Sequence, residues 1–173
     1  MFLFDRKTGI ISTDHGQIQT PVFMPVGTNA TVKSLSAEDL ESIGAQIILA
    51  NNYHLFLRPG SENIQKLGGV HKFMNWNKPI LTDSGGFQVW SLGIKFDENG
   101  INFRDLVTGK PHFWTPEDAI KSQIQIGADI IMALDVCTPD KASHSETKKA
   151  MDITHEWLTR CKKVAGDTTL FGI

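Results

Sequence analysis

The sequence predicts an α/β protein in which parallel strands alternate with helices. Apolar segments of strand length recur along the chain, and segments with helical periodicity separate them. Polar residues and glycines directly follow several of these strands, which is typical of the ligand-binding edge of a parallel sheet. A length of 173 residues suits one domain with a sizeable core, so a single domain over residues 1–173 is expected.

An antiparallel hairpin is expected near the N-terminus. Thr8–Ser12 and Gly16–Thr20 alternate in polarity around the polar turn Thr13–Asp14–His15. A second hairpin is expected further along, because Ile94–Phe96 and Ile101–Phe103 flank an Asn-Gly turn.

Five strands are expected in the parallel sheet. In chain order they are Pro21–Val26, Gln46–Ala50, Pro79–Thr82, Asp129–Leu134 and Thr169–Ile173.

Four helices are expected between these strands, and their start and stop signals define them. They are Ser36–Gly44, Glu62–Leu67, Thr115–Gly127 and Ser145–Ala165. In the first helix Asp39 stands at the capping-box position, and the spacing of Leu40 and Ile43 predicts that both face inward. In the third helix Thr115 is the cap and Pro116 the first helical residue, a strong start signal.

Two architectures fit this alternation. An open, doubly wound sheet of five strands would be complete at this length. A (β/α)8 barrel needs about 250 residues, so the chain would form little more than its first half. The sequence stops inside an apolar strand with no helix after it, which favours a truncated barrel.

The stretch from Leu81 to Gln88 is the first candidate for chemistry. An apolar strand runs into Asp83, Ser84, two glycines and Phe87. The glycines allow the backbone to approach a ligand closely, and an aromatic face beside a polar rim suits a planar heterocycle. The alternative is an Asx-turn in which Asp83 binds its own backbone and Phe87 enters the core.

Composition and charge exclude several classes. No apolar run approaches the ~20 residues of a membrane span, and the first residues do not resemble a secretory signal. Two cysteines provide no disulfide framework, which agrees with a reducing, cytoplasmic location. The formal net charge of −2 gives no global attraction for nucleic acid, although a local patch remains open.

Five motifs together resemble the tRNA-guanine transglycosylases, the base-exchange enzymes of the queuosine pathway. The resemblance covers nearly the whole chain, and each motif falls at the end of an expected strand. The motifs are Met24–Thr28, Asn51–Leu55 with Leu57–Gly60, Thr82–Gln88, Ala133–Pro139 and Leu170–Ile173.

This resemblance implies a (β/α)8 barrel with an N-terminal antiparallel lid and a zinc-bearing insertion late in the chain. It also implies a double displacement at a ribose. A carboxylate attacks C1′ of guanosine 34 in a GUN anticodon, guanine leaves, and an incoming 7-deazaguanine attacks the covalent intermediate. The incoming base is the aminomethyl-deazaguanine precursor in bacteria and queuine in eukaryotes. A homodimer is implied for the complete enzyme.

The resemblance also assigns roles to residues of this chain. Asp83 corresponds to the catalytic proton acceptor and also binds the base, and Asp135 corresponds to the guanine reader. One carboxylate can accept from both N1–H and the exocyclic amine of guanine, a pairing that adenine cannot offer. The remaining substrate-binding residues implied are Ser84, Gly85, Gly86, Phe87, Gln88 and Cys137 around the base, and Val26, Leu49 and Asn51 around the ribose.

Two departures from the family pattern stand out. Val136 occupies a position where the bacterial enzymes generally carry Glu, so the choice between the precursor and queuine stays open. The family's nucleophilic Asp and its three-Cys, one-His zinc site are expected beyond Ile173. Cys137 and Cys161 match neither the number nor the spacing of those zinc ligands, so no metal site is expected in this chain.

Three functions are therefore weighed. The first is a fragment of a tRNA-guanine transglycosylase, inactive by itself because the nucleophile is missing. The second is a non-catalytic accessory subunit that binds a base and needs a partner to complete the barrel. The third is an unrelated barrel lyase or aldolase that holds a phosphate at Ser84–Gly86, although two nearby carboxylates would repel a phosphate.

Overall fold

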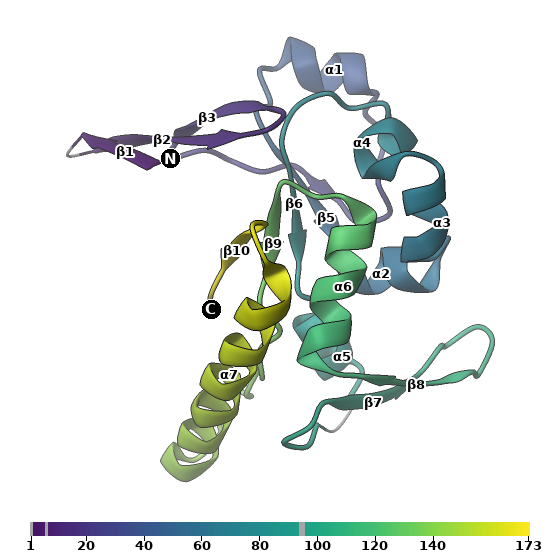
Figure 1. Cartoon of the computed structure of the whole chain (residues 1–173), viewed down its shortest axis with the longest axis vertical. Helices are drawn as coiled ribbons and strands as arrows, with labels where there is room; N and C mark the ends of the chain where they lie inside the picture. Colours follow the sequence, from purple (N-terminus) through teal and green to yellow (C-terminus); the bar gives the residue numbers. More distant parts are fainter. Residues whose placement is uncertain (1, 6, 94–95) are drawn as a thin grey trace.

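A parallel sheet of five strands forms the centre of the structure (Figure 1). The computed structural model describes residues 2–5, 7–93 and 96–173, and for residues 2–5 only the backbone. The strand order is β10-β9-β6-β5-β4, and each neighbouring pair is parallel. The strands are β4 (Val26–Gly27), β5 (Ile48–Asn51), β6 (Ile80–Asp83), β9 (Ile130–Met132) and β10 (Thr169–Phe171).

The strands follow one another across the sheet in chain order. A doubly wound sheet reverses its order at a switch point, and the described strands contain no such reversal. The described strands are therefore wound in one direction, which distinguishes them from the doubly wound sheet, the first of the two expected architectures.

Seven helices lie among the described residues, and several are short. They are α1 (Ala37–Ser42), α2 (Asn52–Leu57), α3 (Ser61–Lys66), α4 (Gly69–Met74), α5 (Gly86–Ser91), α6 (Pro116–Ile126) and α7 (His144–Ala165). Figure 1 shows that α6 and α7 run opposite to the strands that follow them, as βα-alternation requires.

Two antiparallel sheets flank the parallel one. The first contains β1 (Phe2–Asp5), β2 (Thr8–Thr13) and β3 (Gly16–Thr20), so the expected N-terminal hairpin is confirmed and extended by one strand. The second pairs β7 (Ile101–Arg104) with β8 (Pro111–Trp114). Figure 1 places the first sheet near the amino ends of the parallel strands and the second near their carboxyl ends.

The parallel sheet has a core on each face. On the outer face its strands pack against the helices, and the fully buried Ile48, Ile80 and Ile131 belong to that larger cluster. On the inner face a smaller cluster joins Ile18 of β3 to Ile47, Leu81 and Ile130. Alternate residues of one strand thus serve two different apolar layers, which fixes the register of the sheet.

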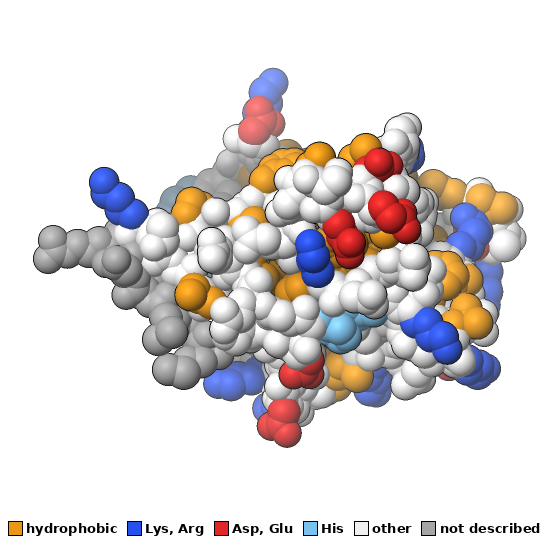
Figure 2. All heavy atoms as spheres, turned by 90° about the horizontal axis from the view of Figure 1, so that it is seen from above, with side chains coloured by type: hydrophobic (Ala, Val, Ile, Leu, Met, Phe, Trp, Pro, Cys, Tyr) orange, Lys and Arg blue, Asp and Glu red, His pale blue; other side chains and the backbone are white. Residues whose placement is uncertain are grey.

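A polar contact also attaches the N-terminal sheet of β1, β2 and β3 to the parallel sheet. Asp129, just before β9, accepts from His15 Nδ1 at 2.8 Å and from His71 Nε2 at 2.9 Å. The two imidazole rings are stacked with centroids 3.5 Å apart. Seen from above, this end of the molecule carries acidic, basic and apolar side chains side by side (Figure 2).

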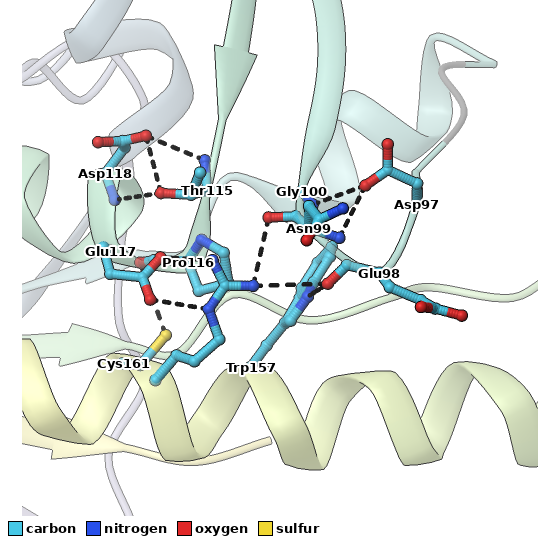
Figure 3. Close-up of polar contacts among 11 residues, drawn as sticks. Asp97, Glu98, Asn99, Gly100, Thr115, Pro116, Glu117, Asp118, Trp157 and Cys161 are labelled. Carbon is cyan, nitrogen blue, oxygen red and sulfur yellow. Dashed lines mark hydrogen bonds and ion pairs between the residues drawn. The ribbon is translucent and has the colours of Figure 1, made fainter.

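Helix α7 secures the start of α6 and the loop at Asp97–Gly100 (Figure 3). Arg160 makes a bidentate ion pair with Glu117, at 2.7 and 2.6 Å, and also donates to the carbonyl oxygens of Glu98 and Asn99. Trp157 is fully buried and donates its indole N–H to the Glu98 carbonyl at 3.0 Å. These contacts connect three segments that are remote in sequence.

Several expectations are corrected by the structure. The expected strand Pro21–Val26 shrinks to the two residues of β4, because Pro21 and Pro25 lack the N–H that a sheet ladder needs. Ile43 does not face inward: it is 67% exposed, since α1 ends before it and Ile43 is the C-cap.

The second expected hairpin is only partly right. The turn at Asp97–Gly100 forms, and Phe96 makes an isolated antiparallel bridge to Ile101. However, the main partner of β7 is β8, which the sequence did not predict. The remainder of the expected strand, residues 94 and 95, lies outside the described residues. No helix in the described part of the chain is long and apolar enough to cross a membrane.

Candidate functional site

Two carboxylates stand at the carboxyl ends of neighbouring strands. Asp83 is the last residue of β6, and Asp135 follows β9 by three residues. Because β6 and β9 pair directly in parallel, these two ends lie at the same edge of the sheet. The structure therefore brings together the two residues that the sequence singled out.

Asp83 is held by the end of the adjacent strand. The side chain of Asn51 and the backbone N–H of Asn52 donate to its two oxygens, at 2.5 and 3.2 Å. Burial raises the pKa of Asp83 to about 6, although these hydrogen bonds and one from the backbone of Gly85 oppose the rise and the nearby charge of Asp135 adds to it. A carboxyl group with this pKa can exchange a proton near neutral pH.

Ser84, the residue after Asp83, binds the other acid. Its hydroxyl donates to Asp135 Oδ1 at 2.9 Å and accepts from the backbone N–H of Gly86 at 3.1 Å. Neither carboxylate forms an ion pair with a basic side chain in the described part of the chain. Both therefore retain acceptor capacity for a ligand that carries N–H groups.

Cys137 contacts the same carboxylate. Its thiol donates to Asp135 Oδ2 at 3.4 Å. Burial, together with the charge and hydrogen bond of Asp135, raises the pKa of Cys137 to about 12. The thiol is therefore protonated at neutral pH and unsuited to nucleophilic attack.

The two glycines allow close packing at the site. Gly85 has a φ of +86°, and a Cβ there would lie 2.9 Å from the Trp114 ring. A Cβ on Gly86 would lie 2.8 Å from Asp135 Oδ1. Any side chain at Gly86 would therefore displace the carboxylate, so this position requires glycine for the geometry of Asp135.

The expected ribose contacts share the inner face of the sheet. Val26, Leu49 and Leu81 are register partners across β4, β5 and β6, so their side chains point to the same face. Asn51 and Asp83 are partners two residues further on, and therefore continue this face to the carboxyl edge. Val26 and Leu49 thus lie on the same side of the sheet as Asp83.

Phe87 and Gln88 lie in the first turn of α5. Phe87 is 58% exposed, with its ring 5.5 Å from that of Trp90, so it is not a core residue. The Oε1 atom of Gln88 is buried and has no hydrogen-bond partner among the described groups. A buried acceptor without a partner is costly unless a ligand or water satisfies it.

Sequence reasoning missed a polar layer beneath the site. Asn52, Ser122 and Gln123 are buried and hydrogen-bonded to the ends of β5, β6 and β9. Asn52 lies within one of the singled-out motifs, but Ser122 and Gln123 lie in the middle of α6. The one signal for this layer in the sequence was Gln123 itself, a polar residue on the side of the helix that faces the core.

The described residues do not fit the zinc site of the family pattern. Cys137 bonds Asp135, whereas the buried Cys161 donates to the Pro116 carbonyl at 3.7 Å, so the two thiols serve different elements. His15, His71 and Asp129 form the one metal-competent cluster found among the described residues. The two imidazole rings are stacked, and each directs one nitrogen at a different oxygen of Asp129. Hydrogen bonds between the imidazoles and the carboxylate account for this arrangement.

The fold and this arrangement define a class: an α/β protein with two carboxylates at the carboxyl edge of a parallel sheet. Such an edge suits a polar ligand that offers several N–H donors. Comparison with known proteins then makes the class more specific. The chain belongs to the tRNA-guanine transglycosylase family, because the family model for queuine tRNA-ribosyltransferase matches residues 5–173.

Similar curated proteins carry the same description. The queuine tRNA-ribosyltransferase of Herpetosiphon aurantiacus is 56% identical over 173 residues, which cover 98% of this chain and 44% of that protein. The corresponding protein of Thermoanaerobacter pseudethanolicus is 53% identical over 174 residues, covering 98% and 46%. That of Halothermothrix orenii is 53% identical over 171 residues, covering 96% and 46%. The chain thus spans less than half the length of these relatives.

Proposed function

We propose that this chain carries the guanine-recognising part of a tRNA-guanine transglycosylase. The complete reaction would exchange guanine 34 of a GUN anticodon for a 7-deazaguanine, either the aminomethyl precursor or queuine, by double displacement at the ribose. The 173-residue chain tested as such would bind guanine but not exchange it, because the family resemblance assigns the nucleophile to a later segment.

One observation carries this proposal: Asp83 and Asp135 lie at one sheet edge, and the hydroxyl of Ser84, the residue after Asp83, donates to Asp135. Asp135 would accept from N1–H and the exocyclic amine of guanine. Phe87 would stack on the base, and Gln88 Oε1 and Cys137 would line its pocket. Gly85 and Gly86 would let the base approach the backbone closely.

Asp83 would act as the proton acceptor. Its pKa of about 6 leaves it mostly ionised at neutral pH, yet close enough to neutrality to return the proton. Val26, Leu49 and Asn51 would border the ribose, because their side chains lie on the same face of the sheet as that of Asp83. The nucleotide would have to leave its stack to reach this edge.

The proposal extends to the whole protein. The one-directional order of the five strands supports a (β/α)8 barrel of which residues 1–173 form the N-terminal part, as one domain. The remaining barrel would supply the nucleophile and a structural zinc site. The complete enzyme would be a cytoplasmic homodimer acting on tRNA.

Isothermal titration of the chain with guanine and with adenine tests the proposal. We expect guanine to bind and adenine to bind at least tenfold more weakly, since a bidentate base contact contributes about 1–3 kcal/mol of discrimination. Asp135→Asn should remove most of this preference. Asp140→Asn makes the same change at an exposed residue further along the chain and should retain the preference for guanine.

Two results would contradict the proposal. One is an Asp135→Asn variant that still prefers guanine to adenine as strongly as the unaltered chain. The other is a sugar phosphate that raises the melting temperature more than guanine does, which would favour the barrel lyase instead. Incorporation of labelled guanine into a GUN-anticodon tRNA by the 173-residue chain would overturn the expected inactivity.

A further inference from the structure

A buried glutamine on α6 lies beneath the two strand ends that carry the acids. Gln123 is fully buried, and its amide lies between Thr82 of β6 and Met132 of β9. Thr82 immediately precedes Asp83, and Met132 lies three residues before Asp135. Gln123 therefore contacts both acid-bearing segments.

Every hydrogen-bonding position of this amide is occupied. Its Oε1 accepts from the Thr82 hydroxyl at 2.9 Å and from the Met132 N–H at 2.9 Å. Its Nε2 donates to the carbonyl oxygens of Met132 at 2.9 Å and of Ala119 at 3.2 Å. A side-chain amide has two acceptor and two donor positions, so the network defines one orientation of the group.

The amide lies where direct pairing of the two strands stops. The β6–β9 ladder consists of Leu81 with Ile130 and Thr82 with Ile131, and it ends before Asp83. The Gln123 amide binds both backbone groups of Met132, the first residue of β9 beyond the ladder, and the side chain of Thr82, the last residue of β6 within it. It thereby continues the connection between the strands after their own hydrogen bonds have ended.

Ser122, the residue before Gln123 on α6, binds the end of the third strand, β5, through Asn52. Ser122 donates to Asn52 Oδ1 at 2.7 Å, and Asn52 in turn donates from its side chain to the Ser84 carbonyl. The backbone N–H of Asn52 also binds Asp83. One turn of α6 therefore contacts the ends of β5, β6 and β9 through a fully buried polar layer, which is rigid when it is fully satisfied.

We propose that Gln123 is a positioning residue: its amide sets the separation between Asp83 and Asp135, and so the width of the base-binding edge. This inference rests on the proposed function for its ligand. A residue whose only role was to fill the core would be apolar, since burying an amide is costly unless its bonds are needed. Misplacing a binding group by about 1 Å can cost two orders of magnitude in function.

Gln123→Met tests the proposal, because it keeps the length of the side chain and removes all four hydrogen bonds. We expect the Kd for guanine to rise about tenfold or more in protein that remains folded. The pKa of Asp83, followed by carboxyl-carbon NMR, should fall slightly as Asp135 moves away, because the charge of Asp135 is the smallest influence on it and burial, the largest, stays unchanged. Gln125→Met is the matched control on the same helix and should leave both quantities unchanged.

A second variant covers the case in which Gln123→Met does not fold. Thr82→Val preserves shape and removes one of the bonds to the amide, so a smaller change in the same direction is expected in both measurements. Unchanged guanine affinity and unchanged Asp83 titration in a folded Gln123→Met variant, or in Thr82→Val if the former is unfolded, would overturn the inference.

The two readouts also separate this inference from the proposed function. If the unaltered chain does not bind guanine, the proposed function fails, and the titration of Asp83 still decides whether Gln123 controls the spacing of the acids. If guanine binds to the unaltered chain and to the variants alike, only the positioning role fails.

Discussion

Asp83 occupies a position that opposes its own ionisation. Burial is the largest influence on its pKa and raises it from 3.8 to about 6, despite hydrogen bonds from Asn51 and Asn52. The difference corresponds to about 3 kcal/mol between the two protonation states. Such a cost is tolerated in proteins mainly where the group has a chemical task, which is why perturbed carboxyl groups gather in functional sites.

This cost predicts a particular pH dependence of stability. The folded-state pKa lies above the unfolded value, so the folded protein binds the proton more tightly. The contribution of Asp83 to stability is therefore largest below pH 3.8 and is lost as the pH rises through about 6. Relative to Asp83→Asn, the unaltered protein should lose about 2.4 kcal/mol between pH 4 and pH 7.

Urea unfolding of both proteins across this range measures the difference directly. Asp140→Asn should run parallel to the unaltered protein, because that residue is exposed and outside the site. A difference between Asp83→Asn and the unaltered protein that stays constant with pH would show that burial does not control this carboxyl group.

Individual residues of the site were predictable to different degrees. Asp83 and Asp135 follow apolar strands, and local sequence is enough to place such residues at a common sheet edge. The contact of Ser84 with Asp135 could not be read from the sequence, because it spans 51 positions and depends on the direct pairing of β6 with β9. Gln123 was missed for the same reason: its partners are set by tertiary packing.

At the scale of elements, local signals located the helices that have strong caps. The capping box of Ser36 with Asp39 and the cap at Thr115 were indicated by the sequence and are present, and Thr115 also forms a capping box with Asp118. By contrast, α2, α4 and α5 have six residues each, too few to show a helical period. Their positions follow from tertiary packing, since α2 and α4 contact α6 and α5 contacts α2.

The cap of α6 should have a measurable effect, because this helix supports the strand ends. Thr115 accepts from the Asp118 N–H at 3.2 Å, and the Asp118 carboxylate binds the Thr115 N–H in return. Thr115→Ala should lower the free energy of unfolding by about 1 kcal/mol, and Thr115→Ser should restore most of it. Equal urea midpoints for the two variants would contradict this role for the hydroxyl.

At the scale of the whole molecule, the parallel pairing of the five strands was predictable, and the flanking antiparallel sheets were less so. Alternating strands and helices imply parallel neighbours with right-handed connections, and all five strands appear in chain order. The pairing of β7 with β8 depends instead on aromatic packing, in which Phe103 stacks on His112 with centroids 5.1 Å apart. No local pattern specifies such a contact.

The N-terminal sheet gives the last prediction. It is attached to the parallel sheet by Ile18 in the inner core and by His15, which lies 114 positions from its partner Asp129. Burial favours a higher pKa for Asp129, but the hydrogen bonds from His71, His15 and Ile80 outweigh it and lower the pKa to about 2. Asp129 therefore remains ionised and keeps this attachment across the neutral range.

His15→Ala should loosen the N-terminal sheet without unfolding the parallel one. It removes one charge-assisted bond but leaves His71 on Asp129, so a loss of about 1.5 kcal/mol should speed amide exchange in β2 and β3 roughly tenfold. Amides of β5 and β6 should exchange at their original rates. Asp14→Asn, in the same turn, is the control and should change neither set. Equal acceleration throughout would show instead that the two sheets unfold as one unit, with His15 contributing to global stability alone.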